Sequence, residues 1–194
     1  VKACKQAGVG YLTLYAFSKE NWVRPQAEVS GLMHLLREFL RNKSAELQKE
    51  RIRLRVIGTP GDLPPGVQKE LDRVIEQTRE GDQGQLVLAL SYSGRAEIVQ
   101  AARSLAAAAA EGALPPDAID EALFASRLYA PDVPDPDLLI RTSGEMRLSN
   151  FLLWQLSYAE LYFSPVMWPE FREAQFQEAL EVYARRCRRF GDVE

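Results

Sequence analysis

The sequence predicts an α/β fold in which a parallel-rich central sheet is flanked by helices. Short apolar segments rich in β-forming residues alternate with longer segments whose apolar residues recur at helical spacing. Such alternation is typical of βαβ units, whose right-handed crossovers place helices over the faces of a parallel sheet. Because the 194 residues contain neither a repeat nor a linker, we expect residues 1–194 to form a single domain.

Five segments predict strands because they are short, largely apolar and rich in β-forming residues. The first of them is apolar on both faces, as expected for a strand buried inside a parallel sheet. In chain order the predicted strands are residues 11–17, 53–57, 85–92, 138–140 and 160–163.

The predicted helices follow from apolar residues at spacings of three and four. Residues 1–7 have the pattern of a helix end that Gly8 closes, since glycine readily adopts the left-handed conformation of a helix cap. Residues 18–26 are expected to form a polar loop. The other predicted helices are residues 28–50, 67–79, 94–110, a segment that starts at Pro115 and ends before Pro131, and 171–190.

The charge balance and the cysteine content argue against several classes of protein. With 24 basic and 27 acidic side chains the formal net charge is −3, whereas proteins that bind a nucleic-acid backbone usually carry a clear basic excess. Cys4 and Cys187 lie near opposite ends without metal-ligand spacing, and two cysteines do not make a disulfide framework. We therefore expect a cytoplasmic protein without a nucleic-acid partner.

The longest apolar-rich stretch is not predicted to span a membrane. Residues 151–168 are interrupted by Gln155, Glu160 and Pro165, whereas a membrane span needs about 20 predominantly apolar residues. Peripheral contact with a membrane surface stays open.

Arginines follow several of the predicted strands, at the carboxyl ends where parallel sheets bind ligands. Each lies in a segment rich in Gly, Ser or Asn. Guanidinium forks and small polar residues together suit phosphate oxygens, which suggests a phosphate or diphosphate site. For any one arginine the alternative is a solvated side chain or an ion pair with a nearby acid. The four arginines are Arg24, Arg95, Arg141 and Arg147.

Glu160 stands among aromatic and aliphatic residues in the segment YAELYF, residues 158–163. A carboxylate in such surroundings must be paired, protonated or bound to a cation. Beside a diphosphate the cation would be Mg²⁺, which takes one or two carboxylates together with phosphate oxygens. A salt bridge to an arginine is the alternative of equal weight.

Other reaction classes find no support in the sequence. His34 is the single histidine, and no Ser or Cys nucleophile with an adjacent base is evident, so a histidine-based hydrolase is not predicted. Neither a G-x-G-x-x-G motif nor a Walker A motif occurs, so no nucleotide cofactor is indicated.

Four stretches in the same order together resemble the cis-prenyltransferase family, in particular its bacterial undecaprenyl diphosphate synthase branch. The resemblance covers essentially the whole chain, and its motifs are long and family-specific. The stretches are LYAFSKENWVRP at residues 14–25, SYSGR at 91–95, IRTSGEMRLSNFLLWQ at 140–155 and YAELYF at 158–163.

The resemblance implies an Mg²⁺-dependent, homodimeric, cytoplasmic enzyme. Such an enzyme adds isopentenyl diphosphate to farnesyl diphosphate with new cis double bonds, and its product is a long polyprenyl diphosphate. Undecaprenyl diphosphate, a lipid carrier precursor for cell-wall synthesis, is one such product. The growing chain needs an apolar tunnel, for which we consider Leu32, Val56 and Leu88 as lining residues.

The resemblance also implies roles for individual residues. Asn21 matches the residue that helps remove a proton as the double bond forms, and Glu160 matches the Mg²⁺ ligand. The remaining matches are substrate-binding positions, the last two of which belong to a C-terminal Arg-x-Gly signature that reaches across the dimer. They are Ser18, Lys19, Glu20, Trp22, Arg24, Arg141, Arg147, Leu148, Ser149, Arg189 and Gly191.

The chain departs from the family pattern in two ways. The opening strand of the family and its Asp-Gly-Asn-x-Arg-Trp motif, which supplies an aspartate for Mg²⁺, do not occur in the 194 residues, so we expect a longer protein. Met146 stands where some members have a histidine, so that position receives no metal role.

Two alternatives to the enzyme stay open. One is a catalytically silent partner subunit, or a polyprenyl- or diphosphate-binding module, of the same fold. Such a protein would be expected to lose the arginines and Glu160, which this chain retains. The other alternative is an unrelated phosphate-binding α/β domain, which the length of the matching motifs disfavours.

Overall fold

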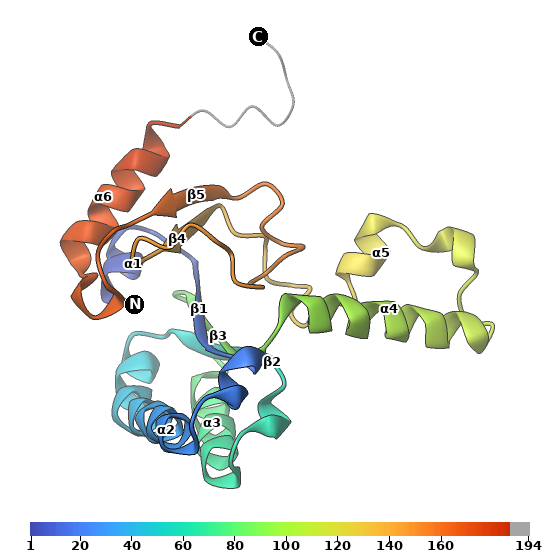
Figure 1. Ribbon diagram of the computed structural model, residues 1–194, viewed down its shortest axis with the longest axis horizontal. Helices are drawn as coiled ribbons and strands as arrows, with labels where there is room; N and C mark the ends of the chain where they lie inside the picture. Colours follow the sequence, from blue (N-terminus) through green and yellow to red (C-terminus); the bar gives the residue numbers. More distant parts are fainter. Residues whose placement is uncertain (187–194) are drawn as a thin grey trace. The chain divides into compact units, whose positions relative to one another are not determined.

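The structure, a computed structural model, describes residues 1–186 and divides the chain into two compact units, Val1–Asp132 and Val133–Glu194 (Figure 1). Each unit contains one sheet, and every strand pair is parallel. The predicted fold class is therefore confirmed, with its strands divided between two sheets. The segment between the third and fourth strands forms helices and a proline-spaced loop, and it adds no strand to either sheet.

The sheet of the first unit has the strand order β1-β3-β2, with β1 at Tyr11–Ser18, β2 at Arg53–Gly58 and β3 at Gln85–Tyr92. The central strand β3 is buried from Leu86 to Tyr92, because parallel strands with neighbours on both sides lose contact with water on both faces. The carboxyl ends of all three strands lie at the same edge of the sheet. The loops that follow them are thereby brought together.

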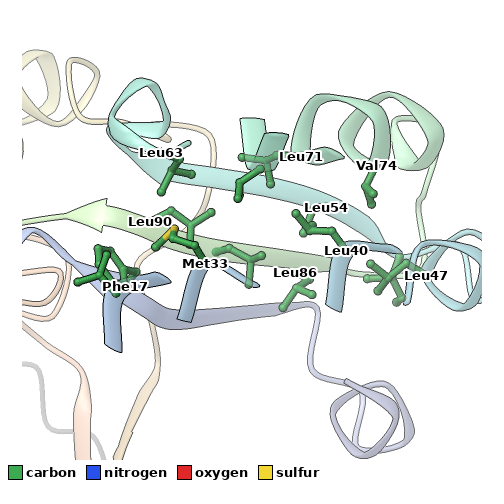
Figure 2. Packing of buried hydrophobic residues seen from close by; sticks show 14 residues of the cluster. Phe17, Met33, Leu40, Leu47, Leu54, Leu63, Leu71, Val74, Leu86 and Leu90 are labelled. Carbon is green, nitrogen blue, oxygen red and sulfur yellow. The ribbon is translucent and has the colours of Figure 1, made fainter. Parts of the chain in front are cut away.

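Two helices, α2 at Gln26–Lys49 and α3 at Pro65–Thr78, pack side by side over this sheet (Figure 1). Their apolar residues meet alternate residues of the strands in one hydrophobic cluster, since side chains at every second strand position face the same way (Figure 2). In the centre of the cluster Leu40, Leu71 and Leu90 are at most 1% exposed. The rest of this core includes Phe17, Met33, Leu47, Leu54, Leu63, Val74 and Leu86.

The short helix α1, Lys2–Gln6, is joined to α2 by two ion pairs. Lys2 lies 3.0 Å from Glu46, and Lys5 lies 2.7 Å from Glu50. Gly8 follows with a φ of 73°, as expected for the residue after a helix end.

Beyond β3, helix α4 spans Gly94–Ala110 and contacts the short helix α5, Glu121–Ala125. The side chain of Ser93 caps α4 by accepting a hydrogen bond from the backbone N–H of Ala96 at 3.3 Å. In the second unit β4, Leu138–Arg141, pairs with β5, Glu160–Phe163, and α6, Glu173–Ala184, packs on β5.

Four expectations for individual elements differ from the structure. The segment after Pro115 is not one helix but a turn at Pro116–Ala118 followed by α5. The helix is interrupted because Asp120 adopts an extended backbone, and its side chain caps α5 at the N–H of Leu123, 2.8 Å away.

The loop expected at residues 18–26 contains a 3-10 turn, η1, at Lys19–Val23. The strand expected to be buried inside the sheet, β1, pairs only with β3 among the described strands and is mostly half-buried. The predicted closing helix begins two residues late, at Glu173, and ends at Ala184, whereas the sequence predicted a helix to residue 190.

None of the helices in residues 1–186 combines the length and the apolar character that a crossing of the bilayer requires.

Candidate active site

The loop after β1 carries the first group of predicted site residues. It turns sharply because the side-chain oxygen of Asn21 accepts the backbone N–H of Ser18 at 2.9 Å, which closes the 3-10 turn η1. With its Oδ1 engaged in this way, Asn21 can offer the N–H groups of its amide to a ligand. Ser18 and Asn21 are half-buried at the end of the strand.

Trp22 fixes this loop to the sheet. Its ring meets the buried ring of Phe17 edge to face, with 4.8 Å between the ring centroids. Its indole Nε1–H donates to Oγ of Ser91, 2.9 Å away at the end of β3. Trp22 therefore has both an apolar contact and a hydrogen-bond partner.

The other predicted residues of this loop lie nearer to solvent. Arg24 is exposed and donates to Glu28 one helical turn further on, at 2.6 Å. An exposed pair of this kind contributes little to stability, so the guanidinium can exchange Glu28 for a ligand anion at small cost. Lys19 is half-buried and Glu20 is exposed.

The loops after β2 and β3 complete this edge of the sheet. Ser91 is fully buried and has a φ of 45°, which a non-glycine residue seldom adopts. Its hydroxyl donates to Oδ2 of Asp62 at 2.6 Å. Gly58 has a φ of 110°, and a Cβ at this position would overlap the carbonyl oxygen of Leu90. The sharp exit of β2 therefore depends on glycine.

The first turn of α4, which follows β3, contains a buried acid. Glu97, 2% exposed, accepts the hydroxyl of Tyr92 and the backbone N–H of Tyr129, the latter at 3.0 Å. Burial raises the pKa of the Tyr129 phenol, a hydrogen bond with Thr59 opposes the rise, and the charges of Glu97 and Asp62 add to it. Glu97 thus ties the segment around Tyr129 to the first turn of α4.

In the second unit, the loop after β4 is shaped by residues in the left-handed conformation. Ser143, Gly144, Ser149, Asn150 and Leu152 all have φ between 42° and 68°. The backbone N–H groups of Ser143 and Gly144 donate to carbonyls of Val166 and Ser164, at 2.8 and 2.9 Å. These bonds extend the contact between the two strand ends into the loop. Strained backbone of this kind clusters at ligand-binding sites.

Arg141, the last residue of β4, has a guanidinium Nε that is buried and has no hydrogen-bond partner. A buried N–H group of a cation without an acceptor is costly, so it is rarely left unpaired unless a ligand completes it. The predicted partner of Arg141 is an anion. Its buried Nε is therefore available to an anion.

The other predicted anion-binding residues of this loop are more open. Arg147 is 64% exposed and pairs with Glu145. Ser149 is exposed and Leu148 half-buried, on the left-handed part of the loop and just before it. An exposed pair with a close neighbour leaves Arg147 able to turn toward a ligand.

Glu160 opens β5, and its carboxylate is paired with an arginine. Oε2 accepts from Nη1 of Arg186 at 2.8 Å, and the same Nη1 donates to the carbonyl of Leu161 at 2.8 Å. The side chain of Glu160 is 27% exposed. The salt bridge that the sequence offered as an alternative to a cation is therefore formed.

The predicted magnesium site has one carboxylate, that of Glu160, among the residues that the structure describes. No group of three or more His, Cys, Asp or Glu side chains there is arranged to hold a metal. Mg²⁺ accepts one carboxylate when phosphate oxygens and water supply its remaining ligands, so Glu160 fits a magnesium that arrives with a diphosphate.

The structure gathers the predicted residues into two groups, one in each unit. Ser18, Lys19, Glu20, Asn21, Trp22 and Arg24 share the loop after β1, whereas Arg141, Arg147, Leu148, Ser149 and Glu160 belong to the ends of β4 and β5. Arg189 and Gly191 lie outside the described residues.

Sequence reasoning missed Asp62, Ser91 and Arg186. The first two follow predicted strands or end them, so the rule that ligand sites lie at carboxyl strand ends could have marked them. Arg186 belongs to the basic segment that follows α6. Cations are favourable at any helix C-terminus, so nothing in the sequence indicated that Arg186 pairs with Glu160.

Comparisons with known proteins identify the family of this chain. Residues 1–191 match the family model described as putative undecaprenyl diphosphate synthase. An isoprenyl transferase of Geobacter sulfurreducens is 50% identical over 192 residues, which are 98% of this chain and 78% of that protein. One from Heliobacterium mobile is 47% identical over 194 residues, covering 100% of this chain and 75% of that protein.

Two solved structures are similar as well. Lavandulyl diphosphate synthase from Lavandula x intermedia, crystallised with dimethylallyl diphosphate, has a TM-score of 0.96 and 39% identity, covering 98% of this chain and 83% of that one. A probable undecaprenyl diphosphate synthase from Campylobacter jejuni has a TM-score of 0.87 and 35% identity, covering 98% and 88%.

Proposed function

Since this chain belongs to the undecaprenyl diphosphate synthase family and is a cis-prenyltransferase, we propose that it condenses isopentenyl diphosphate with an allylic diphosphate, farnesyl diphosphate, to make a long polyprenyl diphosphate. The observation that carries the proposal is the buried, unpartnered Nε of Arg141 at the end of β4. It is an anion site of the kind that a diphosphate completes. The dimethylallyl diphosphate bound to the lavender enzyme supports an allylic diphosphate as one substrate.

In the proposed reaction the bond between C1 of the allylic substrate and its diphosphate oxygen breaks. A new bond forms from C4 of isopentenyl diphosphate to that C1, and a proton leaves C2 as the cis double bond appears. The diphosphate of isopentenyl diphosphate would lie on Arg141, with Arg147, Leu148 and Ser149 beside it. Fixed cationic donors stabilise such charge without rearranging during the reaction.

The loop after β1 would contact the substrates through Ser18, Lys19, Glu20, Trp22 and Arg24. Asn21 would assist removal of the proton. A carboxamide is not a base, and its Oδ1 already accepts the N–H of Ser18. Its role is therefore to orient the group that takes the proton, by donating an N–H to it.

We further propose Mg²⁺ as the cofactor and Glu160 as one of its ligands. Bound there, Mg²⁺ would neutralise diphosphate charge. The ion pair of Glu160 with Arg186 is part-exposed, so exchange of this arginine for a cation costs little.

The finer parts of the proposal rest on the relatives. They are a cytoplasmic homodimer in which Arg189 and Gly191 reach the neighbouring site, and undecaprenyl diphosphate as the product, made for the lipid carrier of cell-wall synthesis. The description of the matching family model, putative undecaprenyl diphosphate synthase, supports the product.

The test is turnover of radiolabelled isopentenyl diphosphate by the full-length protein with farnesyl diphosphate and Mg²⁺, followed by chromatography of the extracted products. Label in a long, cis-containing polyprenyl diphosphate over many turnovers is expected. Binding of both substrates without turnover would replace the proposal by the silent partner subunit, and a product without cis double bonds would refute the reaction type.

A further inference from the structure

We propose that Asp62 and Ser91 position the substrate loop after β1 by fixing the indole of Trp22. This inference rests on the proposed function of that loop. It concerns residues that lie outside the loop and do not touch the substrates, so both act as positioning residues.

The first step is the direction of the hydrogen bonds. An indole N–H only donates and a carboxylate oxygen only accepts. The hydroxyl of Ser91 must therefore accept from Trp22 at 2.9 Å and give its own proton to Asp62 at 2.6 Å. A serine hydroxyl that donates to a carboxylate becomes a better acceptor, so the two bonds strengthen each other.

The second step is the origin of the three residues. Trp22 lies in the loop after β1, Asp62 in the loop after β2, and Ser91 at the end of β3. The two hydrogen bonds from Trp22 to Ser91 and from Ser91 to Asp62, here called the relay, therefore join all three strand ends of one sheet. Trp22 also packs against the hydrophobic core of the first unit, where its ring meets that of Phe17.

The third step is the rigidity of the support. Asp62 stands in the 3-10 turn η2, Pro60–Asp62, whose carbonyls at Gly61 and Leu63 accept from the side chain of Gln68 at 3.2 and 2.6 Å. Leu63 is 2% exposed and anchors the turn in the core. Ser91 is fully buried in an unusual backbone conformation, which directs its hydroxyl at a fixed point.

The proposal follows from these steps. The relay holds the turn at Lys19–Val23 in one orientation, so the donors of Asn21 and Arg24 meet a substrate without first being ordered. Loss of the relay leaves only a fraction of the loops competent to bind, and the apparent affinity falls by that fraction. Chemistry in the bound state would change little.

The test compares Asp62→Ala with Asp62→Asn, which keeps an oxygen acceptor for Ser91. Asp62 is exposed, so neither change opens the core. Asp117→Ala is the matched control, because Asp117 is an exposed acid in another three-residue 3-10 turn that begins with proline. Ser91→Ala, which keeps the Cβ in the same backbone conformation, is the second test variant.

Two measurements are made on each variant. Asp62→Ala and Ser91→Ala are expected to raise KM for farnesyl diphosphate about fivefold, the factor that one hydrogen bond is worth, with kcat within about twofold of the parent. The indole N–H of Trp22, identified among the three tryptophans by Trp22→Phe, should exchange with deuterium several times faster. Asp62→Asn should restore most of both values, and Asp117→Ala should change neither.

The outcomes separate this inference from the proposed function. If the parent protein shows no turnover, the proposed function fails, while the exchange of the Trp22 indole proton still decides whether the relay exists. An indole exchange rate equal to that of the parent in both Asp62→Ala and Ser91→Ala would overturn the relay. A fall in kcat and in the melting temperature with unchanged KM would reduce the pair to a structural role and would also overturn the proposal.

Discussion

The guanidinium of Arg186 neutralises the carboxylate of Glu160, with 2.8 Å between Nη1 and Oε2. A cation that binds Glu160 must therefore displace an arginine, and the two compete for one carboxylate. Because the pair is part-exposed, the interaction of the arginine with the carboxylate contributes at most about 1 kcal/mol.

Arg186→Gln is expected to lower the Mg²⁺ concentration that gives half-maximal turnover by about threefold, because it removes a competitor of this strength. Titration of turnover with MgCl₂ measures the effect. Arg185→Gln is the matched control, since Arg185 is an exposed neighbour whose partner is Glu181. An unchanged Mg²⁺ requirement in Arg186→Gln would mean that the arginine and the metal do not share Glu160.

Glu160→Gln should reduce turnover by about a hundredfold or more at saturating substrate, because the amide binds Mg²⁺ poorly while diphosphate charge stays uncompensated. Its melting temperature should stay near that of the parent, since the replaced ion pair is part-exposed. Incorporation of labelled isopentenyl diphosphate and thermal unfolding measured by circular dichroism give the two values. Full turnover in this variant would show that Glu160 is not a ligand of the metal.

Arg141→Lys should raise KM for isopentenyl diphosphate about tenfold to a hundredfold, because an ammonium group lacks the planar fork that binds two phosphate oxygens. Stability should hardly change, since the Nε of Arg141 has no hydrogen bond to lose. Arg103→Lys, an exposed arginine of α4, serves as the control for both measurements. Equal KM values in the two variants would show that the unpartnered Nε does not bind substrate.

Gly58→Ala should destabilise the protein by about 2 kcal/mol or more, because its Cβ would overlap the carbonyl of Leu90 and φ is 110°. Gly61→Ala, three residues on, meets nothing within 4 Å and should change stability by less than about 1 kcal/mol. Urea unfolding curves compare the two. Similar midpoints for both variants would contradict the argument from close approach.

The link between α1 and α2 should depend on pH. Lys43 and Lys2 lower the pKa of Glu46 from 4.5 to about 2. Because the folded-state pKa lies below the ordinary value, the contribution of this carboxylate is complete above pH 4.5 and is lost as the pH falls toward about 2. Lys43→Ala should move the pKa of Glu46 back toward 4.5, as read from carboxyl carbon resonances in an NMR titration. An unchanged titration curve would rule out Lys43 as the main cause.

Much of the fold could be predicted from local patterns, because the strands and long helices have strong periodicity. β3, α4 and β5 begin and end at the predicted residues. The segment after Pro115 could not be predicted in the same way, since the backbone of Asp120 and its capping bond decide where α5 starts. The edge position of β1 depends on which strands pair, which no local pattern contains.

The candidate site was predictable only in its residue types and its position at strand ends. The roles of Arg141, Asn21 and Glu160 all stay predictions, although the buried Nε of Arg141 is available to an anion. The contacts that set the geometry are long-range. Trp22 and Ser91 are 69 residues apart in the sequence, and Glu160 and Arg186 are 26 residues apart. Such pairings depend on tertiary packing, so spacing along the chain gives no sign of them.

The central place of β3 also sets an order for assembly during synthesis. Tyr11 of β1 and Arg53 of β2 both pair with Gln85, so among the described strands neither of the earlier two can form these pairings until the third has left the ribosome. The pairing is parallel and non-local, which makes it slow even afterwards. Nascent chains that end before Tyr92 should therefore bind chaperones that hold exposed apolar segments, and release from them should follow as β3 emerges.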